Sequence, residues 1–335
     1  MIRIGQIGLG AWGKNLLRNF YTLGGCELII AADVNDKAIE KLKPGYPNVE
    51  FTTDIDSVLN AGKIDAVVIA TPPKDHYELA VKAIEAGLDV FVEKPLVLNV
   101  RHGEELLKLA EEKKKIIMVG HIMEYHPATE YLKGIIDKGE LGRVYYLYSS
   151  RVNLGKVRDI ENSLWSFAPH DISMINYLIG EKPTKVSADG QWYLQEGIED
   201  VAFMTMHYPG KTMAHVHVSW LDPHKDRKLT IVGSDKMAVF NDTEPAEKIR
   251  IFDKSVQISQ DYNTYGEYLS LRTGDIVIPK IPVGEPLKAE CEHFVNCVEN
   301  RLQPRSDGND GLAVLKILDA AQKSLELGGQ PQTIE

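Results

Sequence analysis

Residues 4–13 constrain the fold more than any other part of the chain, because an apolar stretch there runs directly into the pattern Gly-x-Gly-x-x-Gly. Gly8 permits the tight turn that leaves a strand, and Gly10 has no Cβ atom, so a phosphate group can approach the backbone. Gly13 lets the following helix lie close to the sheet. The pattern predicts a strand, a turn and a helix whose N-terminal N–H groups bind the phosphates of a dinucleotide.

The residues that follow support this interpretation. Apolar residues recur at helical spacing from Trp12 to Leu23, and a second apolar strand then ends in Asp33, about 20 residues after Gly13. A carboxylate at this position accepts hydrogen bonds from a ribose 2′-hydroxyl and repels a 2′-phosphate, so we predict NAD rather than NADP. Two alternatives stay open: the glycine loop only closes the strand–helix–strand unit, or Asp33 only caps the next helix.

Composition limits the kinds of partner that the chain can have. The chain of 335 residues is long enough for two domains, and its formal net charge of −10 without a basic block argues against nucleic acid. No apolar run reaches the roughly 20 residues that span a bilayer. The N-terminus enters a strand at once, so we expect no targeting peptide. The three cysteines lack metal-like spacing and fit a reducing, cytoplasmic environment.

Strands and helices alternate up to about residue 121. Apolar strands are expected at residues 65–70, 89–92 and 116–120, with helices between them. A continuous apolar run is typical of a strand that is buried on both faces of a parallel sheet. We therefore predict an α/β fold whose first domain, residues 1–121, is a doubly wound Rossmann domain that binds NAD.

The pattern changes in residues 122–335, for which we predict a substrate-binding and oligomerisation domain. Segments of alternating polarity over residues 184–253 predict a large open sheet, mainly antiparallel, with one face on a helix layer. A helix is expected to begin at His170, and residues 254–286 are expected to be irregular. Two final helices are expected to pack back toward the Rossmann domain.

Three features together resemble one family. The nucleotide-binding pattern lies at the N-terminus, Glu93-Lys94-Pro95 ends a late Rossmann strand, and an α/β domain with an open antiparallel sheet follows. Thr71-Pro72 followed by His76 fits as well. The chain resembles the Gfo/Idh/MocA oxidoreductases over essentially its whole length. The resemblance implies NAD(P)-dependent oxidation or reduction at a carbon that bears a hydroxyl, usually on a sugar or cyclitol. The candidate cofactor-binding residues are Gly8, Gly10, Ala11, Trp12, Gly13, Asp33, Thr71, Pro72, His76, Glu93 and Lys94.

Loop motifs are similar to one branch of this family. The segments 120–127, 150–155 and 164–171 look like those of enzymes that act on UDP-linked N-acetyl amino sugars, which oxidise the C3 hydroxyl of the sugar. The resemblance therefore implies an NAD-dependent dehydrogenase of a UDP-linked N-acetylhexosamine or its uronate. Two alternatives stay open, namely a cyclitol or free-sugar dehydrogenase and a non-catalytic regulator that binds NAD and a sugar.

Two residues are candidates for catalysis. Lys94 follows a parallel strand at the sheet edge where α/β proteins bind ligands, and its ammonium can hydrogen-bond the reacting oxygen; alternatively, it only pairs with Glu93. His170 matches the acid/base histidine of the family, although a capping or core role is also possible. Ser166 stands where the family has an aspartate, and Asp171 is not assumed to replace it. The sequence leaves open which candidate is the base.

A basic loop follows a tyrosine-rich strand expected at residues 143–153. Arg151, Lys156 and Arg158 could grip the oxygens of a diphosphate, or they could form a solvated loop that pairs with the acids just after it. The candidate substrate-binding residues are Lys94, Tyr125, Arg151, Asn153, Lys156, Arg158, Trp165 and His170.

Histidines on the predicted antiparallel strands raise the question of a metal. His215 and His217 share one face at a spacing that could bind zinc, and His207 lies on a nearby strand. No cysteine or tight carboxylate cluster completes a site, and hydride transfer to NAD needs no metal, so we predict none.

We expect the open sheet face to pack on another subunit in a dimer or tetramer. The residues expected in that interface are Met204, Met206 and Trp220.

Overall fold

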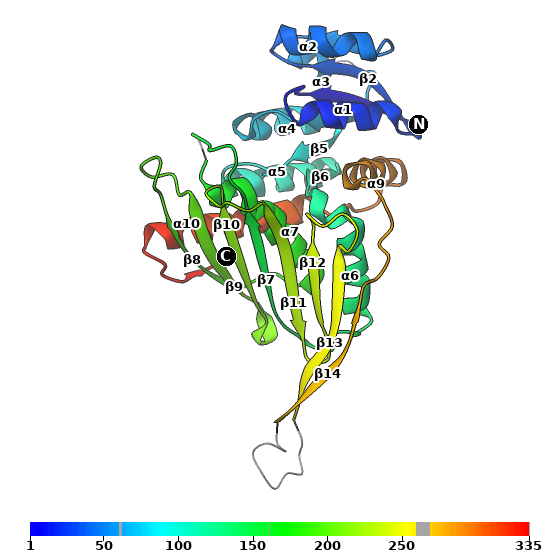
Figure 1. Cartoon of the computed structure of the whole chain (residues 1–335). Helices are drawn as coiled ribbons and strands as arrows, with labels where there is room; N and C mark the ends of the chain where they lie inside the picture. The colour runs from blue at the N-terminus through cyan, green and yellow to red at the C-terminus, as the bar shows by residue number, and fades with distance from the viewer. Residues whose placement is uncertain (60–61, 160, 259–268, 335) are drawn as a thin grey trace. The chain divides into compact units, whose positions relative to one another are not determined.

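The computed structural model of the protein describes residues 1–59, 62–159, 161–258 and 269–334 (Figure 1). The chain divides into two compact units. The first unit comprises residues 1–125 and 284–315, and the second comprises residues 126–283 and 316–335. Each unit is described by itself below.

The first unit is built on a six-stranded parallel sheet with the order β3-β2-β1-β4-β5-β6. The strands are β1 (Ile2–Ile7), β2 (Cys26–Ala32), β3 (Glu50–Thr52), β4 (Ala66–Ile69), β5 (Asp89–Glu93) and β6 (Ile117–Gly120). The winding direction reverses between β1 and β4, and doubly wound sheets bind ligands at such a point, beyond the carboxyl ends of the strands. The predicted Rossmann fold is confirmed.

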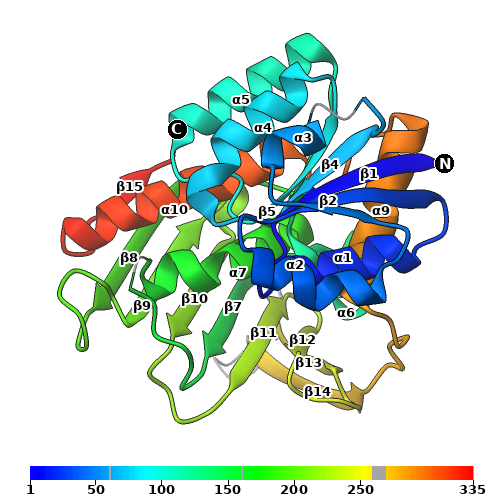
Figure 2. The ribbon, with the colours of Figure 1, turned by 90° about the horizontal axis from the view of Figure 1, so that it is seen from above.

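Helices cover both faces of this sheet (Figure 2). One face carries α1 (Gly13–Thr22) and α2 (Asp36–Leu42), and the other carries α3 (Ile55–Leu59), α4 (His76–Glu85) and α5 (Val100–Lys113). Short 3-10 helices occur at η1 (Lys43–Gly45), η2 (Pro73–Asp75) and η3 (Ile122–Tyr125). The late helix α9 (Pro286–Asn300) packs against α1, so a segment far along the chain completes the first unit.

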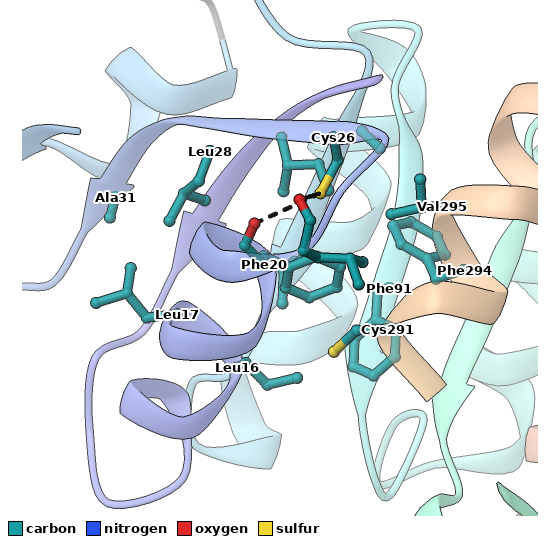
Figure 3. Close-up of a cluster of buried hydrophobic side chains, with 14 of the residues drawn as sticks. Leu16, Leu17, Phe20, Cys26, Leu28, Ala31, Phe91, Cys291, Phe294 and Val295 are labelled. Carbon is teal, nitrogen blue, oxygen red and sulfur yellow. Dashed lines mark hydrogen bonds between the residues drawn. The ribbon is translucent and has the colours of Figure 1, made fainter. Parts of the chain in front are cut away.

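The core of the first unit explains this position of α9 (Figure 3). Phe294 of α9 meets Phe20 of α1 and Phe91 of β5, and all three side chains are fully buried. Their rings pack edge-on, with centroids 5.6 to 6.3 Å apart. Such aromatic pairs add about 0.5–1.5 kcal/mol each beyond the burial of apolar area. The three cysteines of the chain are buried free thiols, and Figure 3 shows two of them at this cluster.

The second unit contains a nine-stranded sheet with the order β14-β13-β12-β11-β7-β10-β9-β8-β15. The strands are β7 (Val144–Val152), β8 (Lys185–Gln191), β9 (Val201–His207), β10 (Met213–Ser219), β11 (Asp226–Gly233), β12 (Met237–Asn241), β13 (Ile249–Ile258), β14 (Leu269–Val277) and β15 (Gln332–Thr333). Among the described strands of this sheet, only the pair β7 and β10 is parallel, so the expectation of a mainly antiparallel sheet is confirmed.

Helices line one face of this sheet (Figure 1). They are α6 (Pro127–Asp137), α7 (Ser163–Ile179) and the later part of α10 (Gly308–Glu326), whose first residues belong to the first unit. A short 3-10 helix, η4 (Pro209–Lys211), lies before β10. The helix α7 packs on β7, β9 and β10. This helix therefore covers the middle of the sheet.

Two expectations for the second unit are wrong. The helix α7 begins at Ser163 rather than at His170, because the Asn162 side chain caps it by accepting the backbone N–H of Trp165 at 3.0 Å. Pro169 lies inside this helix, where a proline is unfavourable. Residues 254–286 are not irregular throughout, since β13 and β14 pair there; residues 259–268 lie outside the described residues.

The expected interface residues also lie elsewhere. Met204 and Met206 of β9 are fully buried in the second unit, and so is Trp220, which follows β10. The ring of Trp220 packs edge-on against that of Phe167 of α7, with centroids 6.4 Å apart. Successive side chains of a strand point to opposite faces, so Phe203 lies on the other, open face. Its ring is 43% exposed and stacks on His217 at 4.4 Å. The assignment of Met204, Met206 and Trp220 to an interface is therefore wrong.

Candidate functional site

The glycine loop after β1 has a geometry that separates structural from ligand-facing glycines. A Cβ atom on Gly8 would lie 2.5 Å from the Ala70 carbonyl oxygen, and one on Gly13 would lie 2.2 Å from the Gly8 oxygen. Gly8 also has a φ of +98°. A Cβ atom on Gly10, by contrast, would meet no atom within 4 Å. The chain itself does not require glycine at position 10, so the open space there is available to an approaching phosphate.

Gln6 is a site residue that sequence reasoning missed. Its buried side chain donates from Nε2 to the carbonyl oxygens of Gly8 at 2.9 Å and Gly13 at 2.7 Å. It therefore ties the start of the loop to the first turn of α1. The signal in the sequence is a polar residue in the buried part of β1, close before the glycine pattern.

Asp33 lies at the carboxyl end of β2, and both of its carboxylate oxygens are oriented by the backbone. Oδ2 accepts the N–H of Leu9 at 2.6 Å, and Oδ1 accepts the N–H of Asn35 at 2.8 Å. Each ionised carboxylate oxygen can accept about two hydrogen bonds, so one position on each remains for a ligand hydroxyl. This geometry agrees with the predicted ribose contact. The capping role that was its alternative is not seen, because Asn35 is the N-cap residue of α2 and Asp33 bonds the N–H of Asn35 rather than an N–H within the helix.

Glu93 and Trp12 join the end of β5 to the glycine loop. The indole Nε1 of Trp12 donates to Glu93 Oε1 at 2.5 Å, and the backbone N–H of Lys94 donates to Oε2 at 3.3 Å. Burial raises the pKa of Glu93 to about 7, although these two donors and the Lys94 charge oppose the change. Lys94 is partly buried at the same strand end. The predicted catalytic lysine thus lies directly beside the dinucleotide loop.

Glu290 on α9 is a second buried carboxyl in this region. It is fully buried, and its two oxygens have no hydrogen-bond partner within the described residues. Burial, together with the charges of Glu93 and Glu124, raises its pKa well above the ordinary value. Glu290 therefore keeps its proton to a higher pH than an ordinary glutamic acid, and the two hydrogen-bond donors to Glu93 favour ionisation of Glu93.

Thr71 and Pro72 begin the loop after β4, and His76 lies behind that loop. The His76 ring is fully buried, with Nδ1 at 2.9 Å from the Pro95 carbonyl oxygen and Nε2 at 3.0 Å from the Thr71 carbonyl oxygen. Tyr125 is also buried, and its hydroxyl lies 2.9 Å from Ser306 Oγ. Both side chains therefore make contacts inside the first unit.

The second unit holds the other candidate residues. Arg151 of β7 and Asp171 of α7 form a buried ion pair, in which Nε donates to Oδ2 at 2.5 Å. His170 is partly buried in the third turn of α7, and Ser166 is buried one turn earlier. Asp171 is thus paired with Arg151. Its negative charge offsets the positive charge of the guanidinium before any substrate binds.

The basic loop itself is more open. Lys156 and Arg158 are exposed, and Asn153 is partly buried. Arg158 lies 3.7 Å from Glu161, as expected for pairing within the loop. Trp165 is partly buried and donates from Nε1 to Gln322 at 3.2 Å. Of the three predicted cations, Lys156 and Arg158 therefore have the solvent access that a diphosphate contact needs.

Two further features, a metal site and a membrane-spanning helix, are absent from the described residues. No group of three or more His, Cys, Asp and Glu side chains there is arranged to hold a metal ion. Among the helices in that part of the chain, none combines the length and apolar character needed to cross a bilayer.

The fold and the glycine loop define the class of a dinucleotide-binding α/β protein with a separate mixed-sheet domain. Comparison with known families identifies it further. Residues 2–121 match the oxidoreductase family GFO_IDH_MocA, NAD-binding Rossmann fold, and residues 129–239 match the GFO/IDH/MocA C-terminal domain. The chain belongs to the Gfo/Idh/MocA family of NAD(P)-dependent oxidoreductases.

Individual relatives are distant. The chain is 27% identical to the inositol 2-dehydrogenase of Rhizobium meliloti, with 97% of each chain covered. It is 26% identical to the UDP-N-acetylglucosamine 3-dehydrogenase of Acidithiobacillus ferrooxidans, with 94% of each covered. A structure of that enzyme has the same fold, with a TM-score of 0.81, 23% identity and coverage of 97% of this chain and 98% of that chain. The match spans only 61% of an uncharacterized oxidoreductase from Streptococcus pneumoniae and 57% of a 2,7-anhydro-N-acetylneuraminate hydratase from Mediterraneibacter gnavus.

Proposed function

We propose that the protein is an NAD-dependent dehydrogenase that oxidises a secondary hydroxyl of a sugar, with C3 of a UDP-linked N-acetylhexosamine or its uronate as the preferred position. The observation that carries the proposal is the Trp12–Glu93 hydrogen bond of 2.5 Å, because it joins the glycine loop to the strand end that bears Lys94. A dinucleotide on that loop extends across the sheet toward β4 and β5, since each half of a doubly wound sheet binds one nucleotide.

The choice of NAD rests on Asp33. Its carboxylate is held by two backbone N–H groups and keeps acceptor positions for the ribose hydroxyls. No arginine or lysine follows it in the next three residues, which would otherwise accommodate a 2′-phosphate. The proposal is therefore NAD.

The chemistry assigns separate roles to two residues of the chain. Bound NAD supplies the hydride acceptor, nicotinamide C4. Either Lys94 or His170 removes the hydroxyl proton as the hydride leaves the carbon, and the other hydrogen-bonds the developing alkoxide. The products are a ketone, NADH and a proton on the base. The partly buried Lys94 can take either role, because its neutral amine can accept the hydroxyl proton and its ammonium can donate a hydrogen bond to the alkoxide.

The substrate class rests on the exposed cations of the basic loop. Lys156 and Arg158 would contact the diphosphate, whereas Arg151, already paired with Asp171, would support the strand beneath them. The similarity to the UDP-N-acetylglucosamine 3-dehydrogenase of Acidithiobacillus ferrooxidans supports this choice.

A second candidate is a cyclitol or free-sugar dehydrogenase. It is favoured by the Arg151–Asp171 ion pair and the proximity of Arg158 to Glu161, which leave less positive charge for a diphosphate. The inositol 2-dehydrogenase of Rhizobium meliloti is a relative at similar identity.

In either case we propose a cytoplasmic homo-oligomer, a dimer or tetramer, formed through the open face of the nine-stranded sheet. Exposed aromatic residues there, namely Tyr146, Tyr148 and Phe203, support that interface.

The test is NADH formation with UDP-N-acetylglucosamine, its uronate, glucose and myo-inositol, with glutamate as amino donor and an aminotransferase to remove the ketone. Lys156→Ala should raise KM for the UDP-sugar about 10-fold without changing KM for inositol. Lys185→Ala, an exposed lysine at the start of β8, is the matched control. Lys94→Ala should abolish turnover while NAD still binds. Turnover of free polyols alone would reject the nucleotide-sugar substrate, and NAD binding without turnover of any compound would favour the regulator.

A further inference from the structure

His76 connects the two loops that follow β4 and β5. It is the first residue of α4, and its ring is fully buried. Nδ1 contacts the Pro95 carbonyl oxygen at 2.9 Å, and Nε2 contacts the Thr71 carbonyl oxygen at 3.0 Å. The strands β4 and β5 are parallel neighbours, so these loops leave the same edge of the sheet side by side. One imidazole therefore sets the spacing between them.

The backbone of Lys94 is held on both sides. On the side of residue 93, the Glu93 carboxylate accepts both the Trp12 indole N–H and the N–H of Lys94 itself. On the other side, the carbonyl of Pro95 is held by His76 Nδ1. The Glu93 contact connects this backbone to the glycine loop, whereas the Pro95 contact connects it to α4. His76 is thus the second of two supports for the backbone that carries the Lys94 ammonium.

We propose that His76 is a positioning residue for Lys94, and that its hydrogen bond to the Pro95 carbonyl is the contact through which it acts. The proposal rests on the role of Lys94 proposed above. It replaces the expectation that His76 touches the cofactor, because the ring is buried and both nitrogens face backbone carbonyls.

The chemistry of the ring allows the two contacts to be separated. Burial lowers the pKa of His76, so the ring is neutral at neutral pH and donates from one nitrogen at a time. Both carbonyl oxygens only accept hydrogen bonds. An asparagine side chain places its N–H₂ group near the position of Nδ1, and a glutamine side chain places it near Nε2. His76→Asn therefore keeps the Pro95 contact, and His76→Gln keeps only the Thr71 contact.

The first experiment compares these two variants with His76→Leu, which has neither contact. Displacing a catalytic group by about 1 Å can lower turnover by about 100-fold. We expect kcat to fall about 10-fold to 100-fold in His76→Gln and His76→Leu, and less than about 3-fold in His76→Asn. The dissociation constant of NAD and KM should change little in all three. His102→Gln is the matched control, because His102 is exposed on α5 and stacks on Tyr77 at 4.0 Å.

A purely structural role gives a different result. In that case Asn and Gln variants would lose kcat, NAD affinity and thermal stability together, and the proposal would be rejected. It would also be rejected if neither variant changed kcat. The pH dependence of kcat adds a second criterion, because a displaced Lys94 should shift the limb assigned to its ammonium in His76→Gln and leave it in place in His76→Asn.

Two measurements keep the inference separate from the substrate assignment. The first is the rate of chemical labelling of the Lys94 amine in the NAD-bound protein, followed by mass spectrometry over a range of pH, which requires no substrate. The pH at the midpoint of the labelling curve should shift in His76→Gln but not in His76→Asn. The second is nitrogen NMR of the histidine rings in the unmodified protein. Hydrogen on Nδ1 of His76 is expected, and hydrogen on Nε2 alone would overturn the proposal even if no variant folds.

Discussion

Replacing Asp33 by serine should reverse the cofactor preference, and the structure allows the size of this change to be estimated. The carboxylate has one acceptor position left on each oxygen after the Leu9 and Asn35 N–H groups are bonded. Two ribose hydroxyls can therefore donate to it, and a hydrogen bond to a charged group contributes about 1.5–3 kcal/mol. Serine can replace one of the two, so Asp33→Ser should weaken NAD binding by about 2 kcal/mol, or roughly 30-fold.

The same substitution removes a repulsion against NADP. Two unit charges about 4 Å apart repel by about 1 kcal/mol in bulk water and about 4 kcal/mol near a protein surface. A 2′-phosphate carries nearly two charges, and Asp33 is only partly buried, so a gain of about 2 kcal/mol for NADP is the appropriate lower bound. The ratio of the two dissociation constants should thus change by about 1000-fold.

Titration of both cofactors by calorimetry measures this ratio. Asp36→Ser is the matched control, because Asp36 is an exposed acid in the first turn of α2 and should leave the ratio unchanged. A ratio that changes less than about 3-fold in Asp33→Ser would refute the ribose contact. Equal loss of both cofactors would instead show that Asp33 acts only by holding the glycine loop through Leu9.

Four further substitutions test the site and the core. Gly13→Ala should abolish NAD binding, since its Cβ would lie 2.2 Å from the Gly8 oxygen, whereas Gly10→Ala should weaken NAD binding with little change in thermal stability. Phe294→Ala should cost about 3–5 kcal/mol in urea unfolding, and a loss below 1 kcal/mol would contradict the packing. For Glu290, burial raises the pKa in the folded protein, so the folded state keeps a proton that the unfolded chain releases, and stability falls as pH rises above the ordinary pKa. Glu290→Gln should therefore stabilise the protein at about pH 8 and not at about pH 4; an effect independent of pH would exclude this explanation.

The parts of the site that the sequence predicted are those made by local contacts. The glycine pattern, the strand before it and Asp33 all act within the first 35 residues, where spacing alone defines the strand–turn–helix geometry. The doubly wound Rossmann sheet and the mainly antiparallel second sheet followed from hydrophobic periodicity together with the family resemblance. The local sequence pattern was therefore sufficient to predict the dinucleotide-binding part of the candidate site.

The parts that the sequence did not predict depend on contacts between distant residues. The helix α7 begins before Pro169 and continues through it, although a proline is unfavourable inside a helix, so its start is not evident from the local pattern. The pairing of β13 with β14 was missed because the segment lacks a clean alternation of polar and apolar residues. Gln6 was missed because the two carbonyl groups it bonds become neighbours only once the loop has folded.

The Arg151–Asp171 ion pair also bears on which residue acts as the base. Asp171 faces β7 and is committed to Arg151, so it does not support a protonated His170 from the next position in α7. Ser166 occupies the position where the family has an aspartate, and a hydroxyl cannot carry the negative charge that stabilises an imidazolium. We therefore expect Lys94 to carry more of the proton transfer than His170. Lys94→Ala should lower kcat at least about 10-fold more than His170→Asn, measured at saturating substrate and NAD. A larger loss in His170→Asn would show instead that the histidine is the main base.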